Sequence, residues 1–327
     1  MNQSKRIEWI DIAKGLGILA VILGHLKIPD ILIRLIFSWH MPLFFIISGI
    51  LFKDKNFVEL LKSKFKSLIK PYLYTCLAMI LFACLKNYLN NVNIEDAIIY
   101  WTKASLYGSG DKRLFGLPAI GALWFLLAMF WGIIFIHFCL KFKYPVLPIS
   151  SLFALGYFTK DFWLPLSIQS GMVSVIYIYI GLILKEKNIL PKLINVKSFI
   201  LCLTIWIFGI YNGCGHLCMV CNYFELKQWD FLVSLVAVIM IFNISHYIKK
   251  FHFLSFPIQF AGKNSLKFLC FHILELNLFP WETFVHGNFI HKKIFLLKLI
   301  YVYSATFILN MLKKLKIQSK SPITPKM

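Results

Sequence analysis

Three ionisable side chains lie on one face of the first apolar segment of the chain. Asp11, Lys14 and His25 fall within residues 9–28, whose other side chains are mostly suited to lipid. At 100° per residue, Lys14 and His25 project within about 20° of each other, with Asp11 about 40° to the other side. Charged and imidazole groups are costly inside a membrane and persist mainly where they line a pathway or perform chemistry.

This stripe predicts a catalytic role for His25. An imidazole is the usual general base near neutral pH, and it can also carry an acyl group itself. Asp11 and Lys14 would then orient the imidazole or guide a substrate. Their spacing of three residues equally suits a structural ion pair on one helix face, so both roles stay open.

Further polar residues in apolar segments are candidates for binding a substrate: His40, Trp124, Asn264 and His272. His40 stands two residues before Pro42 in the segment 31–52, and we expect Pro42 to kink that helix and free a carbonyl group. Trp124 opens a later apolar segment, where an interfacial aromatic residue is the alternative explanation. The other two candidates form a second polar face in the segment 253–277.

The stretch 53–70 combines lysines with apolar residues and predicts an amphipathic helix at the membrane surface that ends at Pro71. Such a stretch can cradle a phosphate-bearing cofactor, because each lysine presents a point charge. Polybasic loops also bind anionic lipid and fix topology, so this alternative stays open. The residues proposed to meet the phosphates are Lys62, Lys64, Lys66 and Lys70.

Three of the eight cysteines cluster with His216 in a C-x3-C-x2-C pattern at Cys214, Cys218 and Cys221. A zinc site, one disulfide or free thiols at a helix end all fit this pattern. No second pair of ligands completes a zinc motif, and no metal site is predicted. The other cysteines lie in apolar runs and are expected to be small core residues.

The composition identifies an integral membrane protein. Of the 327 residues, 59% are hydrophobic and only 15% are charged. The formal net charge of +21 does not indicate nucleic-acid binding, because the basic residues gather in short loops between apolar runs. Residues 9–28 carry Asp11 and Lys14, unlike the core of a cleaved signal peptide, and are expected to remain as a helix.

The apolar segments predict an all-α, polytopic bundle of about ten transmembrane spans in a single domain over residues 1–327, with no fused soluble domain and no internal repeat. The bias of Lys and Arg between alternate loops, 21 against nine, predicts that both termini are cytoplasmic. The predicted spans are 9–28, 31–52, 71–90, 117–140, 145–159, 164–184, 198–212, 229–248, 253–277 and 294–312.

Taken together, several strings resemble the acyltransferase-3 family of integral membrane O-acyltransferases, in particular its fucose 4-O-acetyltransferase-like branch. The specific blocks are Trp9 to His25 and His40 to Gly49. Weaker blocks match in order at Lys70 to Leu73, Leu123 to Leu126 and Gly262 to Leu266. The resemblance extends over nearly the whole chain.

The resemblance implies that acetyl-CoA or another acyl-CoA donates its acyl group from the cytoplasmic side, with no resident cofactor. The acceptor would be a hydroxyl of a surface glycan or its lipid-linked precursor, in the bacterial cytoplasmic membrane. His25 matches the histidine that is essential in the family. The Arg-x-x-Arg motif that follows the second span in many relatives is absent, since only lysines stand there.

Two other functions fit the same residues. A proton-coupled transporter would also use the intramembrane Asp11, Lys14 and His25, although the chain shows no matching pair of broken helices in two halves. In a purely structural assembly protein, the stripe would serve helix packing. Acetyl transfer from acetyl-CoA by the purified protein separates these functions, because neither alternative predicts it.

Overall fold

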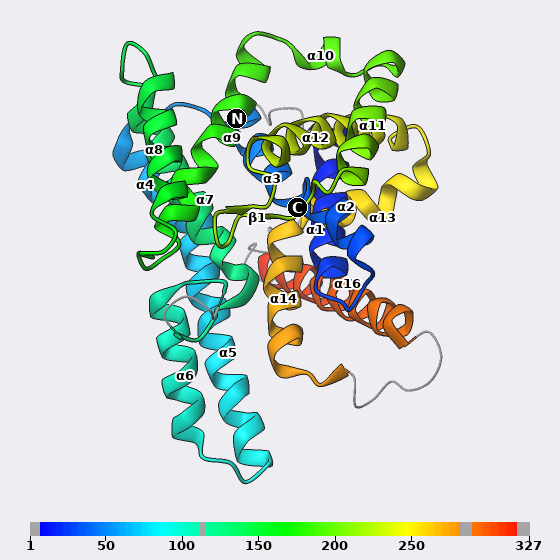
Figure 1. The fold of residues 1–327 in the computed structure, drawn as a ribbon. Helices are drawn as coiled ribbons and strands as arrows, with labels where there is room; N and C mark the ends of the chain where they lie inside the picture. The colour runs from blue at the N-terminus through cyan, green and yellow to red at the C-terminus, as the bar shows by residue number, and fades with distance from the viewer. Residues whose placement is uncertain (1–6, 112–115, 282–289, 319–327) are drawn as a thin grey trace, which may run out of the picture.

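The computed structural model describes residues 7–111, 116–281 and 290–318, and its chain is almost entirely helical (Figure 1). In these ranges the only sheet is an antiparallel pair of two-residue strands, β1 (Leu217–Cys218) and β2 (Tyr223–Phe224). The prediction of an all-α bundle is therefore confirmed.

The helices of the first part of the chain are α1 (Glu8–Gly24), α2 (Asp30–Phe37), α3 (His40–Ile50), α4 (Phe57–Lys64), the π-helix η1 (Phe65–Ile69), α5 (Lys70–Leu89), α6 (Ile94–Tyr107), the 3₁₀-helix η2 (Gly121–Leu123) and α7 (Trp124–Cys139). Those of the second part are α8 (Val146–Phe158), α9 (Ile168–Glu186), α10 (Leu190–Leu193), α11 (Val196–Tyr211), α12 (Gln228–Ile248), α13 (His252–Lys263), α14 (Ser265–Leu278) and α16 (Ile290–Gln318).

Six helical segments of the described chain are long and apolar enough to cross a membrane: Asp30–Ile50, Phe57–Leu89, Gly121–Cys139, Ile168–Glu186, Gln228–Ile248 and Lys292–Lys316. The predicted count of ten is not confirmed. Helices α1, α8 and α11 have 17, 13 and 16 residues, fewer than the ~20 that cross a hydrocarbon core. The predicted span 253–277 is divided at Asn264 into α13 and α14.

The predicted span 31–52 is also two helices rather than one. The chain leaves helical geometry at Trp39, where φ is −138°, and α3 begins at His40. Pro42 therefore lies in the first turn of α3, where a missing N–H has no intrahelical acceptor to lose. The break lies three residues before Pro42, so the expected kink at Pro42 was wrong.

Glycines let helices α1 and α13 cross at close range. A Cβ added to Gly262 of α13 would overlap the carbonyl oxygen of Asp11, and one added to Gly15 of α1 would overlap that of Ile258. Small residues permit such backbone contact between membrane helices. Helix α1 is thereby held against α13 along the half that carries Asp11 and Lys14.

The stretch 53–70 is not a separate surface helix that ends at Pro71. Helix α4 continues through the π-turn η1 into α5, giving one helical segment of 33 residues that passes Pro71 without a break. Helix α6 returns beside α5, and this hairpin projects from the rest of the bundle at the bottom of Figure 1. Residues 94–107 lie between the predicted spans 71–90 and 117–140, so the sequence did not predict this helix.

Candidate active site

His25 ends helix α1 and presents its imidazole to a cavity. It is the C-cap residue of α1, and its ring Nδ1 lies 2.7 Å from the carbonyl oxygen of Val21. A carbonyl oxygen only accepts hydrogen bonds, so Nδ1 carries the hydrogen. In the neutral imidazole, Nε2 then holds a lone pair. His25 therefore has the tautomer that a general base requires at Nε2.

His272 of α14 lies directly against His25. Its Nε2 is 3.4 Å from Nδ1 of His25, and its Nδ1 is 2.7 Å from Oε1 of Glu275. The Glu275 carboxylate accepts the Nδ1 hydrogen of His272, which leaves Nε2 of His272 as an acceptor towards His25. The sequence analysis assigned His272 to substrate binding, whereas the structure places it behind the His25 ring.

Glu275 is the fixed anion at the end of this chain of contacts. Lys298 of α16 is buried, and its Nζ lies 3.1 Å from the Glu275 carboxylate. The indole N–H of Trp281 donates to the same carboxylate. A buried carboxylate with three donors is held in one orientation, and it fixes the orientation of His272 in turn.

Glu275, Trp281 and Lys298 were not among the predicted site residues. A signal for Lys298 was present in the sequence, since it is a charged residue inside the predicted span 294–312. A charge at such a position needs a partner. The partner could not be identified, because the two helices meet only in the tertiary fold.

Two adjoining cavities lie near His25. The smaller one, of about 130 Å³, surrounds the exposed His25 side chain. His40 and Trp124, both predicted to bind substrate, line it as well. Nδ1 of His40 donates to the carbonyl oxygen of Ile36 at 2.9 Å. The structure thus brings together His25, His40 and Trp124 around one space.

Asn264 lies elsewhere. It stands at the break between α13 and α14, where its amide nitrogen donates to the carbonyl oxygen of Phe260 at 3.0 Å. Its side-chain oxygen accepts from Nζ of Lys267 at 3.1 Å and from the amide of Asn310 at 3.2 Å. These contacts join α13, α14 and α16, and Asn264 lines neither of the two cavities described here.

A larger cavity of about 230 Å³ adjoins the smaller one. Lys14 and Lys64 line it, together with the hydroxyl-bearing Ser48, Ser67 and Ser265. The rest of its wall is apolar. Both cavities include Val21, Met41 and Ala122, so these three residues form the boundary between them.

Lys14 and Asp11 form an ion pair, with Nζ of Lys14 3.1 Å from Oδ1 of Asp11. Lys14 is eleven residues from His25, or about 16 Å along the helix at 1.5 Å per residue. The two ends of the predicted stripe therefore line different cavities. Lys14 belongs to the larger cavity and His25 to the smaller one.

Only one of the four lysines predicted to meet phosphates lines the larger cavity. Lys64 does so from the last turn of α4, directly before η1. Lys62, Lys66 and Lys70 are exposed on the surface. A π-turn shifts the side chains that follow it around the helix axis, and such turns occur frequently at functional sites. Here η1 brings Ser67 and Leu68 to the same cavity as Lys64.

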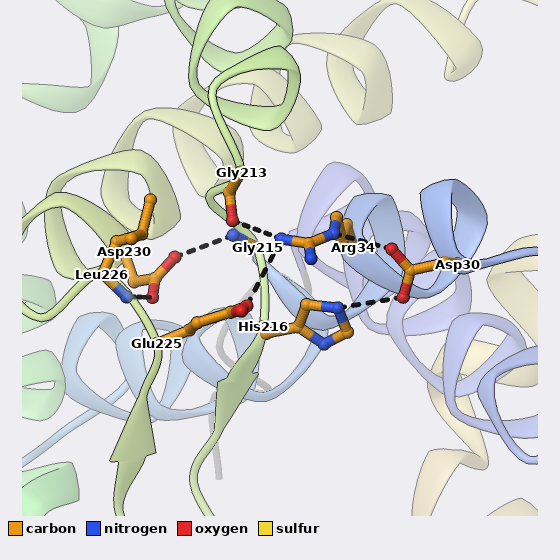
Figure 2. Close-up of polar contacts among 8 residues, drawn as sticks. All are labelled: Asp30, Arg34, Gly213, Gly215, His216, Glu225, Leu226 and Asp230. Atoms are coloured by element: carbon orange, nitrogen blue, oxygen red, sulfur yellow. Dashed lines mark hydrogen bonds and ion pairs between the residues drawn. The ribbon is translucent and has the colours of Figure 1, made fainter.

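The loop between α11 and α12 covers the smaller cavity, which Leu217, Cys218, Met219 and Val220 line. Asp230 at the start of α12 fastens both ends of this loop (Figure 2). Its Oδ1 accepts from the backbone N–H of Gly215 and its Oδ2 from that of Leu226, each at 2.7 Å. We call residues 213–227 the covering hairpin.

Arg34 of α2 fastens the covering hairpin to the bundle (Figure 2). Its guanidinium donates to the carbonyl oxygen of Gly213, lies 3.3 Å from Glu225, and lies 2.8 Å from Asp30 on its own helix. Nε2 of His216 is 3.0 Å from the other oxygen of Asp30. These contacts keep the outer wall of the smaller cavity in place.

Over residues 7–111, 116–281 and 290–318, no group of three or more His, Cys, Asp or Glu side chains could hold a metal ion. The zinc interpretation of Cys214, Cys218 and Cys221 therefore gains no support from the described residues.

Comparison with curated proteins and with solved structures gives no match. Comparison with family models gives a match to the acyltransferase-3 model, which is described as an acyltransferase domain and matches residues 7–313. This range includes both cavities, the His25–His272–Glu275 contacts and Lys298. The protein is therefore an integral membrane acyltransferase, and its chain belongs to the acyltransferase-3 family.

Proposed function

We propose that the protein transfers an acetyl group from cytoplasmic acetyl-CoA to a sugar hydroxyl of a surface glycan or its lipid-linked precursor. The observation that carries this proposal is the position of His25 beside the boundary of two adjoining cavities, with its Nδ1 bonded to Val21 and in contact with His272. The larger, mostly apolar cavity with two lysines suits the thioester end of an acyl-CoA. The smaller cavity, with His40 and Trp124, suits a hydroxyl-bearing acceptor.

In the proposed reaction, Nε2 of His25 takes the proton of the acceptor hydroxyl as that oxygen attacks the thioester carbonyl carbon. The tetrahedral intermediate collapses, the carbon–sulfur bond breaks, and the CoA sulfur leaves with the proton from the imidazolium. His272 and Glu275 hold the ring and stabilise its transient positive charge. The alternative is that His25 accepts the acetyl group first and then passes it to the sugar.

The proposed location is the bacterial cytoplasmic membrane, with both termini in the cytoplasm and about ten spans. The support is the 21-to-nine bias of Lys and Arg between alternate loops. The shorter helices would cross with the help of local thinning or burial in the bundle. In this orientation Lys64 faces the cytoplasmic acyl donor, and the covering hairpin lies outside.

The experiment that tests the proposal is substitution of His25. We expect His25→Ala to lower transfer of labelled acetyl from acetyl-CoA to glycan by at least the ~10²–10⁴-fold typical of general base catalysis. His246→Ala is the matched control, because His246 is an exposed histidine in the last turn of α12. His40→Ala should give a smaller loss, since it lines the cavity without contacting His272.

Acetyl label trapped on wild-type protein but not on His25→Ala would favour the acyl-carrier route over the direct one. Near-normal transfer by folded His25→Ala protein would refute the proposed mechanism. Comparison of the surface glycan by mass spectrometry, with and without the protein, identifies the acceptor.

A further inference from the structure

Two cysteines stand at the tip of the covering hairpin. Cys218 ends β1, and the backbone N–H of Cys221 donates to the carbonyl oxygen of Cys218 at 3.3 Å. The two residues are therefore the first and last of one tight turn. Both are partly exposed and neither forms a disulfide, and Cys218 lines the cavity of His25.

The two sulfur atoms are close enough to interact. A hydrogen bond with Cys218 is the main cause that raises the pKa of the Cys221 thiol, and burial raises it further. Sγ of Cys221 also donates to Oδ2 of Asp111 at 3.0 Å. Cys221 thus keeps its proton at neutral pH, and the Asp111 carboxylate that accepts this hydrogen bond raises the pKa of the thiol further.

We propose that Cys218 and Cys221 are a dithiol pair that is converted to an intrachain disulfide by a disulfide-bearing oxidant on the outer face. Residues i and i+3 of a turn are a spacing at which cysteines commonly pair. The proposal takes the outer position of the covering hairpin from the proposed topology, and disulfides persist on that side of a membrane.

The reaction balances as two thiol–disulfide exchanges. The thiolate of Cys218 attacks the oxidant's disulfide, forms a mixed disulfide and releases one thiol of the oxidant. Cys221 then attacks the sulfur of Cys218, its proton passes to the departing sulfur of the oxidant, and the second thiol is released. Two protein thiols are oxidised, and the oxidant's disulfide is reduced to a dithiol.

The disulfide would act on the cavity wall rather than on overall stability. A loop of four residues has little closure entropy to remove, so the global free energy of unfolding should change little. The bond would instead take Cys221 from Asp111 and fix the Cys218 side chain beside the acceptor cavity. This effect rests on the proposed function, whereas formation of the bond rests only on the outer position of the hairpin.

The test uses the full-length protein, treated with oxidised glutathione, denatured, blocked with N-ethylmaleimide and digested. We expect the peptide with Cys218 and Cys221 to be unlabelled and lighter by two hydrogen atoms, and to take up two labels after reduction. Cys214→Ser should leave this result unchanged, because Cys214 is buried outside the turn. Cys218→Ser and Cys221→Ser should each abolish it.

A second measurement addresses Asp111. The Asp111 carboxylate raises the pKa of the Cys221 thiol, and an asparagine accepts the hydrogen bond without that charge, so Asp111→Asn should speed disulfide formation without changing which cysteines pair. An unchanged rate would remove Asp111 from the reaction. Labelling of both Cys218 and Cys221 after oxidised glutathione, or pairing of either with Cys214, would overturn the proposal. Neither result bears on acetyl transfer, which the His25 experiment measures separately.

Discussion

The carboxylate of Glu275 has two tasks that a substitution can separate. It compensates the buried ammonium of Lys298, and it accepts the Nδ1 hydrogen of His272. We expect Glu275→Gln to destabilise the protein by about 3–5 kcal/mol, because the Lys298 charge loses its buried partner. We also expect transfer to fall by at least about 10²-fold, because an amide nitrogen can reverse the hydrogen bond to His272. Thermal unfolding in detergent and labelled-acetyl transfer measure the two effects.

The control is the double variant Glu275→Gln with Lys298→Met. It removes the uncompensated charge and should recover most of the lost stability. Transfer should stay low, because His272 still lacks a carboxylate. Recovery of transfer together with stability would mean that Glu275 serves the fold alone.

Lys64 is the residue through which the donor side can be tested. If it contacts a phosphate of CoA, Lys64→Ala should raise the KM for acetyl-CoA about tenfold, the lower range for a lost charged hydrogen bond. The dependence of KM on salt should weaken as well. Lys66→Ala is the matched control, since Lys66 is exposed two residues away. Equal effects of both variants would favour a general role of this stretch in lipid binding or topology.

At the residue scale, the sequence was sufficient to predict which segments carry polar side chains but not which of these side chains meet. His25, His40 and Trp124 could be nominated because each is unusual in an apolar segment. The pairing of His25 with His272 joins residues 247 positions apart, and no periodicity encodes it. Asn264 was predicted to bind substrate for the same reason as His272, but its side chain forms hydrogen bonds that join three helices.

Among the elements, the covering hairpin is held at both of its ends by one buried side chain, that of Asp230. Removal of the Asp230 carboxylate leaves the N–H groups of Gly215 and Leu226 without their acceptor, at a cost of about 1–3 kcal/mol for each that stays buried. We expect Asp230→Ala to accelerate hydrogen exchange of residues 214–226 by about tenfold or more, which corresponds to 1.4 kcal/mol. Mass spectrometry of the exchanged peptides measures this.

Asp161→Ala provides the comparison, because Asp161 is an exposed aspartate in the connection between α8 and α9. It should leave exchange in the covering hairpin unchanged. Identical exchange in Asp230→Ala and wild-type protein would mean that the Arg34 contacts alone hold the hairpin.

The hydropathy of the sequence predicted where helices occur, but it did not predict where those helices break. The apolar runs predicted helices at nearly every observed position, because lipid and core both select apolar side chains. No periodicity marks the breaks at Trp39 and Asn264, and the π-turn η1 stands just before Pro71, which lacks the N–H of a regular helix. Helix α6 was missed because its flanks are polar, although Asn93 caps its start and Gly108, with φ of +67°, ends it.

For the whole molecule, the orientation in the membrane is the testable property. We expect reporter fusions at Lys141, Lys187 and the C-terminus to report cytoplasm, because the basic loops are retained there. Fusions at Lys227, after the covering hairpin, and at Asn91, between α5 and α6, should report the outside. A cytoplasmic signal at Lys227 would place the covering hairpin on the donor side and reverse the assignment of the two cavities.

The boundary formed by Val21, Met41 and Ala122 has a consequence for the cell as well as for the reaction. An enzyme that works from both sides of a membrane risks becoming a leak for protons. Apolar constrictions exclude water, and a chain of water is the path that protons would follow. In the proposed reaction, this apolar boundary would let a charged donor enter from one side and a sugar from the other without a continuous path of water between them. The membrane potential, which stores about 2.3 kcal/mol per elementary charge at 100 mV, would then not be discharged between turnovers.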